Sequence, residues 1–365
     1  MDRFLKARKV VGALCSALTL LVLLSALTVQ AADSPTPVSG DFVVPRFTFH
    51  TGQTLDNFRL HYLTLGKRGN PAVLVLHGTG QQAAAMLSTD VGGQLFGPGQ
   101  PLDANKFFIV IPDAIGTGNS TKPSDGLRAA FPHYNYADMV QAQYLLLTQG
   151  LGIRHLRLII GNSMGGMQTW LWGGLHPGFA DGLVPMAAQP TEMAGRNWIM
   201  RRMLVESIRQ DPAWNQGNYQ TQPPSLRLAK TMFEFATSGG TLNYQEIAGT
   251  HAQADALVDK RLAASVAVDA NDFIYQWESS ADYNAEPGLG KIKVPVLAIN
   301  AADDERNPPE TGLMQAALKQ VPSARYLLIP GSVDTRGHGT TGLARLYAAE
   351  LAKFVAQLPN VPQGR

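Results

Sequence analysis

One serine lies in the sequence motif best suited to nucleophilic chemistry. Residues 161–166 read Gly-Asn-Ser-Met-Gly-Gly and follow the apolar, β-branched run 156–160. A strand that turns sharply into a helix at such a motif holds the serine hydroxyl above the sheet edge, and the glycines permit the tight turn. The pattern therefore predicts Ser163 as a nucleophile, followed by a helix over 164–172 that ends near residues 173–174.

A serine nucleophile needs a histidine base and a carboxylate that orients the histidine, here in the chain order serine, acid, histidine. An apolar strand expected at 293–300 is followed by Asp303 and Asp304, and the strand expected at 325–330 is followed by a loop that carries His338. We predict His338 as the base. Asp304 is the preferred acid because its spacing to the next proline, Asp-x-x-x-Pro, matches the turn usual after this strand, and Asp303 is the alternative.

A second loop has the composition of an oxyanion hole. The apolar strand 72–76 runs into residues 77–80, His-Gly-Thr-Gly. Acyl transfer places negative charge on the carbonyl oxygen, which fixed backbone N–H groups stabilise. We expect the N–H groups of Thr79 and Met164 to do so. His77 precedes the nucleophile in the chain, so we expect it to orient this loop rather than to act as the base.

The elements that position these residues alternate between strand and helix. Strands are expected near residues 41–49, 57–65, 72–76, 107–111, 156–160, 182–187, 293–300 and 325–330. This alternation predicts an α/β fold, with a mostly parallel eight-stranded sheet and helices on both faces. With 365 residues, of which 45% are hydrophobic, the chain can bury a large core.

The predicted core has two parts, residues 38–189 and 289–361, separated by an insertion at 190–288. The insertion breaks the alternation of strands and helices and carries aromatic and methionine residues at helix-like spacings. We expect a helical cap over the active site. Most of its apolar side chains would form the core of the cap, and some could line an acyl pocket.

Residues 1–31 are not expected to belong to this fold. Four basic residues within the first nine positions precede an apolar run over 10–29, and residues 29–31, Val-Gln-Ala, offer a cleavage site. This pattern predicts a signal peptide and a periplasmic or secreted mature protein. The apolar run is also long enough to cross a bilayer, so an uncleaved membrane anchor is the alternative.

Composition argues against several classes of function. The lone cysteine, Cys15, lies within the predicted signal, so we expect neither a disulfide nor a thiolate metal site in the mature chain. Without residues 1–31 the chain has 26 basic and 27 acidic residues, a net charge of −1, and no basic patch that would favour nucleic acid. We expect a small-molecule acyl substrate, no cofactor, no metal, and membrane contact only through an uncleaved N-terminal segment; the oligomeric state is left open.

Four segments, in order along the chain, resemble the homoserine O-acetyltransferase branch of the α/β-hydrolase fold. They are residues 97–103 (Gly-Pro-Gly-Gln-Pro-Leu-Asp), 163–168 (Ser-Met-Gly-Gly-Met-Gln), 211–214 with 217–219 (Asp-Pro-Ala-Trp and Gly-Asn-Tyr), and 269–271 (Asp-Ala-Asn). The resemblance implies the α/β-hydrolase fold and a Ser-His-Asp triad that passes an acyl group from acyl-CoA to an amino-acid hydroxyl. These roles would fall to Ser163, His338 and Asp304.

Two departures from that family bear on the expected function. Val205 stands where the family usually has a cap-helix arginine able to pair with an amino-acid carboxylate, although Arg201 lies nearby in another register. Residues 338–341 read His-Gly-Thr-Thr, whereas the family tends to have Asp-Ala-Phe after the histidine. Acyl-CoA is moreover not expected outside the cytoplasm. The sequence therefore favours a serine hydrolase that cleaves a carboxylic ester or related acyl compound through an acyl-enzyme.

Three other functions are less consistent with these residues. Within enzymes, the alternative is an O-acyltransferase of the homoserine O-acetyltransferase-like type, with a donor other than acyl-CoA. A catalytically silent binding protein would not need Ser163, His338 and an acid together. An epoxide or halide hydrolase would need a carboxylate at the position of Ser163.

Overall fold

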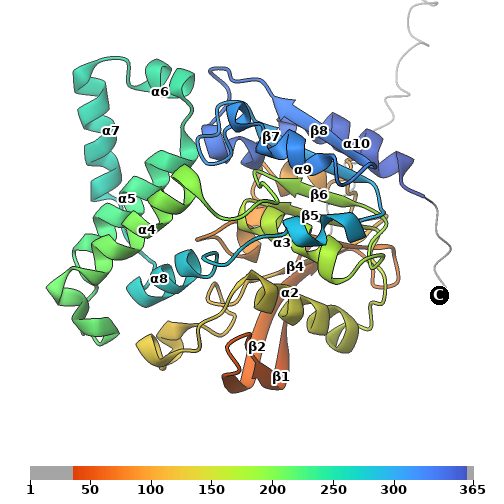
Figure 1. Ribbon diagram of the computed structural model, residues 1–365, viewed down its shortest axis with the longest axis horizontal. Coiled ribbons are helices and arrows are strands. Elements are labelled where there is room, and N and C mark those ends of the chain that lie inside the picture. The colour runs from red at the N-terminus through yellow and green to blue at the C-terminus, as the bar shows by residue number, and fades with distance from the viewer. Residues whose placement is uncertain (1–35, 360–365) are drawn as a thin grey trace, which may run out of the picture. The chain divides into compact units, whose positions relative to one another are not determined.

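The computed structural model describes residues 36–359, which contain an eight-stranded sheet (Figure 1). The strand order is β1-β2-β4-β3-β5-β6-β7-β8. The strands are β1 (Val38–Thr48), β2 (Thr54–Leu65), β3 (Ala72–Leu76), β4 (Phe108–Pro112), β5 (Leu158–Asn162), β6 (Leu183–Met186), β7 (Val296–Ala301) and β8 (Ala324–Ile329). Strands β3 to β8 pair in parallel, and β2 pairs antiparallel with both β1 and β4. The predicted mostly parallel α/β fold is confirmed.

The central strands are apolar along their whole length because both of their faces are covered. Every residue of β3 and β4 is buried. Leu74 and Leu76 of β3 face one apolar core and Val73 and Val75 face the other, as alternation along a strand requires.

Helices flank the sheet on both faces. They are α1 (Gly92–Leu95), α2 (Tyr136–Leu145), α3 (Met164–Leu175), α9 (Leu313–Leu318) and α10 (Ala348–Gln357). Met139 of α2 and Trp170 of α3 belong to the same apolar core as Leu74, whereas Leu351 of α10 belongs to the core on the opposite face. The sheet therefore forms the middle layer between helices.

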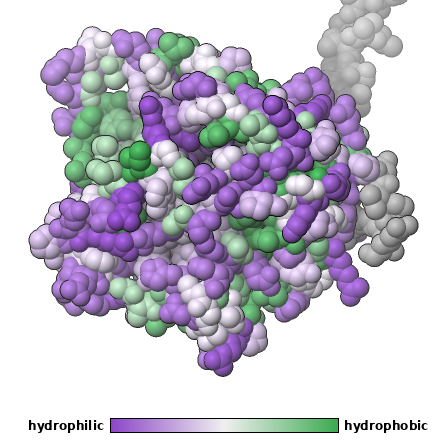
Figure 2. Space-filling model, viewed as in Figure 1, coloured by the Kyte–Doolittle hydropathy of each residue, from purple (hydrophilic) through white to green (hydrophobic). Residues whose placement is uncertain are grey.

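Five helices form an insertion between β6 and β7. They are α4 (Gly195–Arg209), α5 (Ser225–Ser238), α6 (Thr241–Ile247), α7 (His251–Ala263) and α8 (Ala270–Glu278). Figure 1 shows α4 to α7 to one side of the sheet, with α8 between them and the core. Figure 2 shows hydrophobic side chains over this region, where Leu228, Met232, Leu242 and Ile247 are exposed.

Helix α3 ends at Leu175, one residue past the two glycines near which the sequence predicted its end. A Cβ at Gly173 would lie 2.7 Å from the Leu183 side chain, and one at Gly174 would lie 3.0 Å from the backbone of Gly288. The glycines therefore allow close packing of the helix rather than terminating it.

The predicted signal peptide, residues 1–31, lies outside the described residues. Among the helices of residues 36–359, none has the length and apolar character needed to cross a membrane.

Candidate active site

Ser163 occupies a strained turn between β5 and α3. Its backbone angles are φ 54° and ψ −111°, in a region that non-glycine residues rarely adopt. A Cβ at Gly161 would lie 2.1 Å from the Gly165 carbonyl oxygen, and one at Gly165 would lie 2.3 Å from that of Leu76. The motif glycines thus let the helix begin directly against the sheet, which fixes the position of the serine hydroxyl.

The structure brings Ser163, His338 and Asp304 into one hydrogen-bonded chain. The Ser163 Oγ lies 2.7 Å from His338 Nε2, and His338 Nδ1 lies 2.8 Å from Asp304 Oδ2. The three residues are only 6%, 4% and 2% exposed, respectively. With Asp304 ionised, Nδ1–H donates to the carboxylate and Nε2 is free to accept the serine proton.

Asp304 is held by its own loop, which follows β7. Its Oδ1 accepts a hydrogen bond from the Arg306 N–H at 2.8 Å, and its Oδ2 accepts one from the Asn307 side chain at 2.8 Å. Burial acts to raise the pKa of Asp304, but His338 and these two hydrogen bonds outweigh it and hold the pKa below its usual value. The carboxylate is therefore ionised when it meets the imidazole.

Asp303, the alternative acid, has a different role in the structure. Its Oδ2 accepts hydrogen bonds from Thr335 Oγ1 at 2.6 Å and from the Gly337 N–H at 3.3 Å. It thus ties down the loop that leads to His338 without contacting the imidazole. The geometry pairs the imidazole with Asp304.

His338 lies in the short helical turn Gly337–Gly342, where it is buried. Burial lowers the pKa of His338 below 6.5, and the positive charges of Arg306 and Arg201 act in the same direction, against the attraction of Asp304. The imidazole is therefore neutral at pH 7. A neutral imidazole can take a proton from the Ser163 hydroxyl.

The loop after β3 lies beside the nucleophile. A Cβ at Gly78 would be 3.5 Å from the Ser163 Cβ, and the Gly165 N–H donates to the His77 carbonyl at 3.1 Å. The N–H groups of Thr79 and Met164 donate no hydrogen bond to any acceptor within residues 36–359. Two free amides next to a serine hydroxyl are what an oxyanion hole requires.

His77 orients this loop, as the sequence suggested. Its Nδ1 lies 2.8 Å from the Gly78 carbonyl, and its Nε2 accepts a hydrogen bond from the Ala114 N–H at 3.0 Å. Burial lowers the pKa of His77, so the ring is neutral, which the acceptor role of Nε2 also requires. His77 thereby joins the β3 loop to the β4 loop.

Sequence reasoning missed Gln276, a buried residue of α8. Its Oε1 accepts a hydrogen bond from the Gly80 N–H at 3.0 Å, and its Nε2 donates to the Gly116 carbonyl at 2.8 Å. Helix α8 therefore holds the loop after β3 through Gly80, in addition to the contacts that His77 makes. No sequence motif marks this glutamine, because its role depends on where α8 docks.

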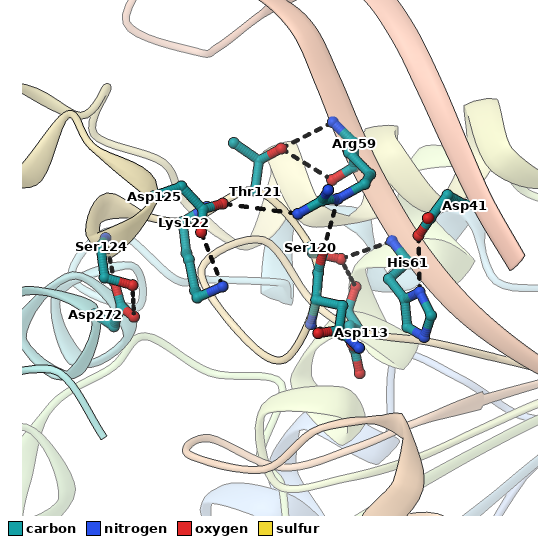
Figure 3. A network of polar contacts seen from close by, with 11 residues as sticks. Asp41, Arg59, His61, Asp113, Ser120, Thr121, Lys122, Ser124, Asp125 and Asp272 are labelled. Carbon is teal, nitrogen blue, oxygen red and sulfur yellow. Dashed lines mark hydrogen bonds and ion pairs between the residues drawn. The ribbon is translucent and has the colours of Figure 1, made fainter. Parts of the chain in front are cut away.

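The loop after β4 is anchored by the polar network of Figure 3. The His61 N–H of β2 donates to Ser120 Oγ at 2.9 Å, and the Ser124 N–H and Oγ donate to Asp272 of α8 at 2.8 and 2.7 Å. Burial raises the pKa of Asp272 to about 6. This loop also contains Gly116, whose carbonyl accepts a hydrogen bond from Gln276. The loop is thus held on one side by β2 and on the other by α8 of the insertion.

The sequence did not identify two buried arginines near the candidate site. Val205, which stands at the family's arginine position, is buried, and Arg201 is buried one helical turn earlier on α4. Residues one turn apart share a helix face, so Arg201 points the same way as Val205. Arg306, in the loop that carries Asp304, is the second buried arginine.

The described residues 36–359 contain no group of three or more histidine, cysteine, aspartate or glutamate side chains able to hold a metal ion. The chemistry that this arrangement supports is nucleophilic: a serine hydroxyl, a neutral imidazole, an ionised carboxylate and two free amides.

Residues 71–333 match the family model described as alpha/beta hydrolase fold, so the chain belongs to that family. The chain is also 30% identical over 294 residues to a homoserine O-acetyltransferase from Trichormus variabilis, covering 72% of this chain and 79% of that protein. It therefore lies in the homoserine O-acetyltransferase-like branch, as the four sequence segments predicted. It spans about half the length of four further homoserine O-acetyltransferases that it matches at 32% to 34% identity.

Solved structures share the fold at lower sequence identity. The L374D mutant of esterase E22 superposes with a TM-score of 0.75 at 21% identity, covering 88% of this chain and 100% of that chain. A homoserine O-acetyltransferase from Bacillus anthracis superposes with a TM-score of 0.74 at 21% identity, covering 88% and 98% of the two chains. Esterases and acetyltransferases are thus both built on this fold.

Proposed function

We propose that this protein is an O-acyltransferase that passes an acyl group through Ser163 to the hydroxyl of a small acceptor. The observation that carries the proposal is the buried chain from Ser163 through His338 to Asp304, beside two free amides. The sequence alone favoured ester hydrolysis. Acyl transfer is supported instead by the Trichormus variabilis relative, which aligns over 79% of its own length and is named homoserine O-acetyltransferase.

The first half of the reaction acylates the enzyme. Ser163 Oγ attacks the acyl carbonyl of the donor while its proton passes to His338 Nε2. The N–H groups of Thr79 and Met164 stabilise the oxyanion, and Asp304 stabilises the imidazolium. The bond to the leaving group then breaks, and His338 returns the proton to that group. The product of this half is acyl-Ser163 with a neutral imidazole.

The second half reverses these roles with a new nucleophile. His338 takes the proton of the acceptor hydroxyl, whose oxygen attacks acyl-Ser163. The new ester leaves, and the proton returns to Ser163 Oγ. The burial of Ser163 supports transfer over hydrolysis, because a bound acceptor competes best with water where solvent has little access.

Ester hydrolysis is the second candidate, and it uses the same acyl-enzyme with water as the acceptor. The N-terminal pattern over 1–31 favours it, because water is the most available acceptor outside the cytoplasm. Val205 favours it as well, since the acetyltransferase family usually has an arginine there.

An assay of acyl partitioning separates the two candidates. Purified protein is given p-nitrophenyl acetate with increasing concentrations of small alcohols and hydroxy acids, and nitrophenol, acetate and O-acetyl product are measured together. We expect an acceptor at millimolar concentration to divert most of the acyl group into O-acetyl product. Equal amounts of nitrophenol and acetate with every acceptor would contradict acyl transfer and leave hydrolysis. Ser163→Ala is the control for background hydrolysis.

We further propose that residues 1–31 direct export to the periplasm or exterior. Expression of the full chain in a Gram-negative host, followed by fractionation and N-terminal sequencing, tests this directly. A mature protein that begins after Ala31 and leaves the cytoplasm is the expected result. An intact N-terminus in the membrane fraction would indicate an anchor, and an intact cytoplasmic protein would overturn export.

A further inference from the structure

The nucleophile and the base of the candidate site lie on two turns that are far apart in the sequence. Ser163 follows β5, and His338 lies in the 3-10 helical turn Gly337–Gly342 after β8. The hydrogen bond between Ser163 Oγ and His338 Nε2 therefore depends on how these two turns are held against each other. Catalytic groups must be held to within about 0.5 Å, so any contact that joins the two turns bears on the reaction.

A second side-chain contact joins the same two turns. Thr341 Oγ1 donates a hydrogen bond to Asn162 Oδ1, and Asn162 is the last residue of β5, directly before the nucleophile. Side chains three residues apart in a 3-10 helix lie on the same face. His338 and Thr341 are three residues apart, so their contacts to the nucleophile and to the residue before it run side by side.

Thr341 is anchored to the core independently of its side chain. The residue is 1% exposed, and its carbonyl accepts a hydrogen bond from Tyr347 Oη at 3.1 Å. Tyr347 is buried in the apolar core that also contains Leu351 of α10. The backbone of Thr341 is thus fixed from below, and its hydroxyl connects this turn to Asn162.

Asn162 lies where three loops of the candidate site meet. Its Nδ2 would lie 3.6 Å from a Cβ at Gly78, in the loop after β3. The hydrogen bond from Thr341 adds the loop after β8. The Ser163 N–H donates to the Met186 carbonyl of β6 at 2.8 Å, which fixes the backbone of the nucleophile against the sheet. The contact between Asn162 and Thr341 sets the distance from there to the turn that carries the base.

This contact uses one of the departures from the homoserine O-acetyltransferase family. Thr341 stands at the third position after the histidine, where that family tends to have phenylalanine. A phenylalanine side chain has no hydroxyl and could not donate to Asn162. The hydroxyl of the preceding residue, Thr340, accepts a hydrogen bond from the Arg336 N–H at 2.8 Å within its own loop. Of these two threonines, Thr341 is the one whose side chain reaches the turn of the nucleophile.

We propose that Thr341 and Asn162 are positioning residues that hold the base against the nucleophile. They act through His338 and Ser163 rather than on the substrate: the hydrogen bond between them keeps Ser163 Oγ within reach of His338 Nε2 while the proton passes. The proposal rests on the proposed acyl chemistry, in which Ser163 is the nucleophile. It holds whether the acyl acceptor is water or an alcohol.

The rate at which a fluorophosphonate labels Ser163 tests the proposal, because this reaction needs an activated serine but no acyl acceptor. Mass spectrometry measures the second-order rate constant and locates the label in the purified protein. Thr341→Val replaces the hydroxyl by a methyl group. Since a displacement of about 1 Å can cost about 10² in rate, this variant should react about tenfold to a hundredfold more slowly. Thr341→Ser keeps the hydroxyl and should retain most of the rate.

Thr148→Val is the matched control. It also removes a threonine hydroxyl, one that donates to the Tyr144 carbonyl at 2.7 Å in the helical segment Leu146–Gly150, outside the candidate site. This variant should react as the wild type does. A rate for Thr341→Val close to that of the wild type, or equal losses in Thr341→Val and Thr341→Ser, would overturn the proposal.

A double-mutant cycle shows whether Thr341 acts through Asn162. Asn162→Ala removes the acceptor, so combining it with Thr341→Val should cost no more than the larger of the two single losses, whereas multiplied losses would contradict a joint role. If Thr341→Val does not fold, Asn162→Ala takes its place in the labelling assay, and a rate close to that of the wild type would again overturn the proposal.

Turnover of p-nitrophenyl acetate separates positioning from stability. The loss in Thr341→Val should appear in kcat with KM nearly unchanged, because the substrate does not contact the two residues. A lower temperature of thermal unfolding with kcat and the labelling rate intact would assign the contact to structure alone.

The failure of this proposal can be told apart from that of the proposed function. A wild type labelled on Ser163, together with Thr341→Val labelled at the same rate, would remove the positioning role and leave the acyl chemistry. A wild type that reacts without a label on Ser163 would remove both.

Discussion

At the scale of single residues, Asp303 and Asp304 are adjacent in sequence but differ in what they contact. Asp304 orients His338, whereas Asp303 bonds Thr335 and Gly337. We expect Asp304→Asn to lower kcat by about 10⁴, as loss of the acid does in other triads. Asp303→Asn should cost less than about tenfold, because an amide oxygen can still accept both hydrogen bonds. Steady-state kinetics of the two variants measure both losses in kcat. Equal losses would show that neither assignment is right.

The pH dependence of catalysis also belongs to the residue scale. His338 must be neutral to take a proton, and burial together with Arg306 and Arg201 lowers its pKa below 6.5. The acid limb of kcat/KM should therefore have its midpoint below pH 6.5. Arg306→Gln removes one of the positive charges, so it should move the midpoint upward, while Arg202→Gln should leave it in place. A midpoint above 6.5, or one that Arg306→Gln shifts downward, would refute this explanation.

At the scale of elements, helix α8 of the insertion contacts the loop after β3, the candidate oxyanion loop, through Gln276. Gln276→Leu removes the hydrogen bonds to Gly80 and Gly116, so the Thr79 amide should lose its fixed position. Removing an oxyanion donor costs about 10²–10³ in kcat, and we expect a loss on the order of tenfold to a hundredfold for this indirect effect.

Kinetics of a neutral p-nitrophenyl ester check the role of Gln276. The loss should appear in kcat with KM nearly unchanged, and a boronate that mimics the tetrahedral intermediate should lose affinity in parallel. Gln245→Leu, at an exposed position of α6, controls for the added leucine. A fall in thermal stability with kcat and boronate affinity intact would assign Gln276 to structure alone.

The sequence predicted the elements of this fold better than the contacts between them. All eight strands form, because their apolar, β-branched runs are buried on both faces or alternate regularly. The end of α3 was predicted to within one residue, but the sequence did not show that Gly173 and Gly174 allow close packing against Leu183 and Gly288. Arg201 is four residues before Val205, which is not the position of the family's arginine. In helix α4 the two residues are one turn apart and share one face.

At the scale of the whole molecule, Asp272 couples protonation to stability. Its pKa is raised from 3.8 to about 6 by burial, so the folded state favours the protonated form. The contribution to stability is fully present below the unfolded pKa and is lost as pH rises through about 6. Relative to Asp272→Asn, the free energy of unfolding of the wild type should fall by about 1–2 kcal/mol between pH 5 and pH 8.

Urea denaturation at both pH values measures this difference. Asp56→Asn, at an exposed carboxylate of β2, is the control and should behave as the wild type does at each pH. A difference between wild type and Asp272→Asn that stays constant with pH, or one that changes in the opposite sense, would contradict the explanation.

The candidate triad was predictable because chain order and strand ends place Ser163, Asp304 and His338 at one sheet edge. Gln276, Arg201 and Arg306 were not, because their roles depend on how the cap packs on the core, which no local pattern encodes. The residues whose contacts depend on packing between distant segments therefore lie where sequence reasoning is weakest, and the candidate triad lies where it is strongest.

Trapping of the acyl-enzyme tests the central claim most directly. The protein is mixed with p-nitrophenyl acetate, quenched in acid and digested, and the peptides are analysed by mass spectrometry, before and after a chase with a hydroxy acid. We predict one acetyl group, on Ser163, that is absent from Ser163→Ala and moves to the hydroxy acid during the chase. Turnover without an adduct on Ser163, or an adduct that releases only acetate whatever acceptor is present, would contradict acyl transfer through this serine.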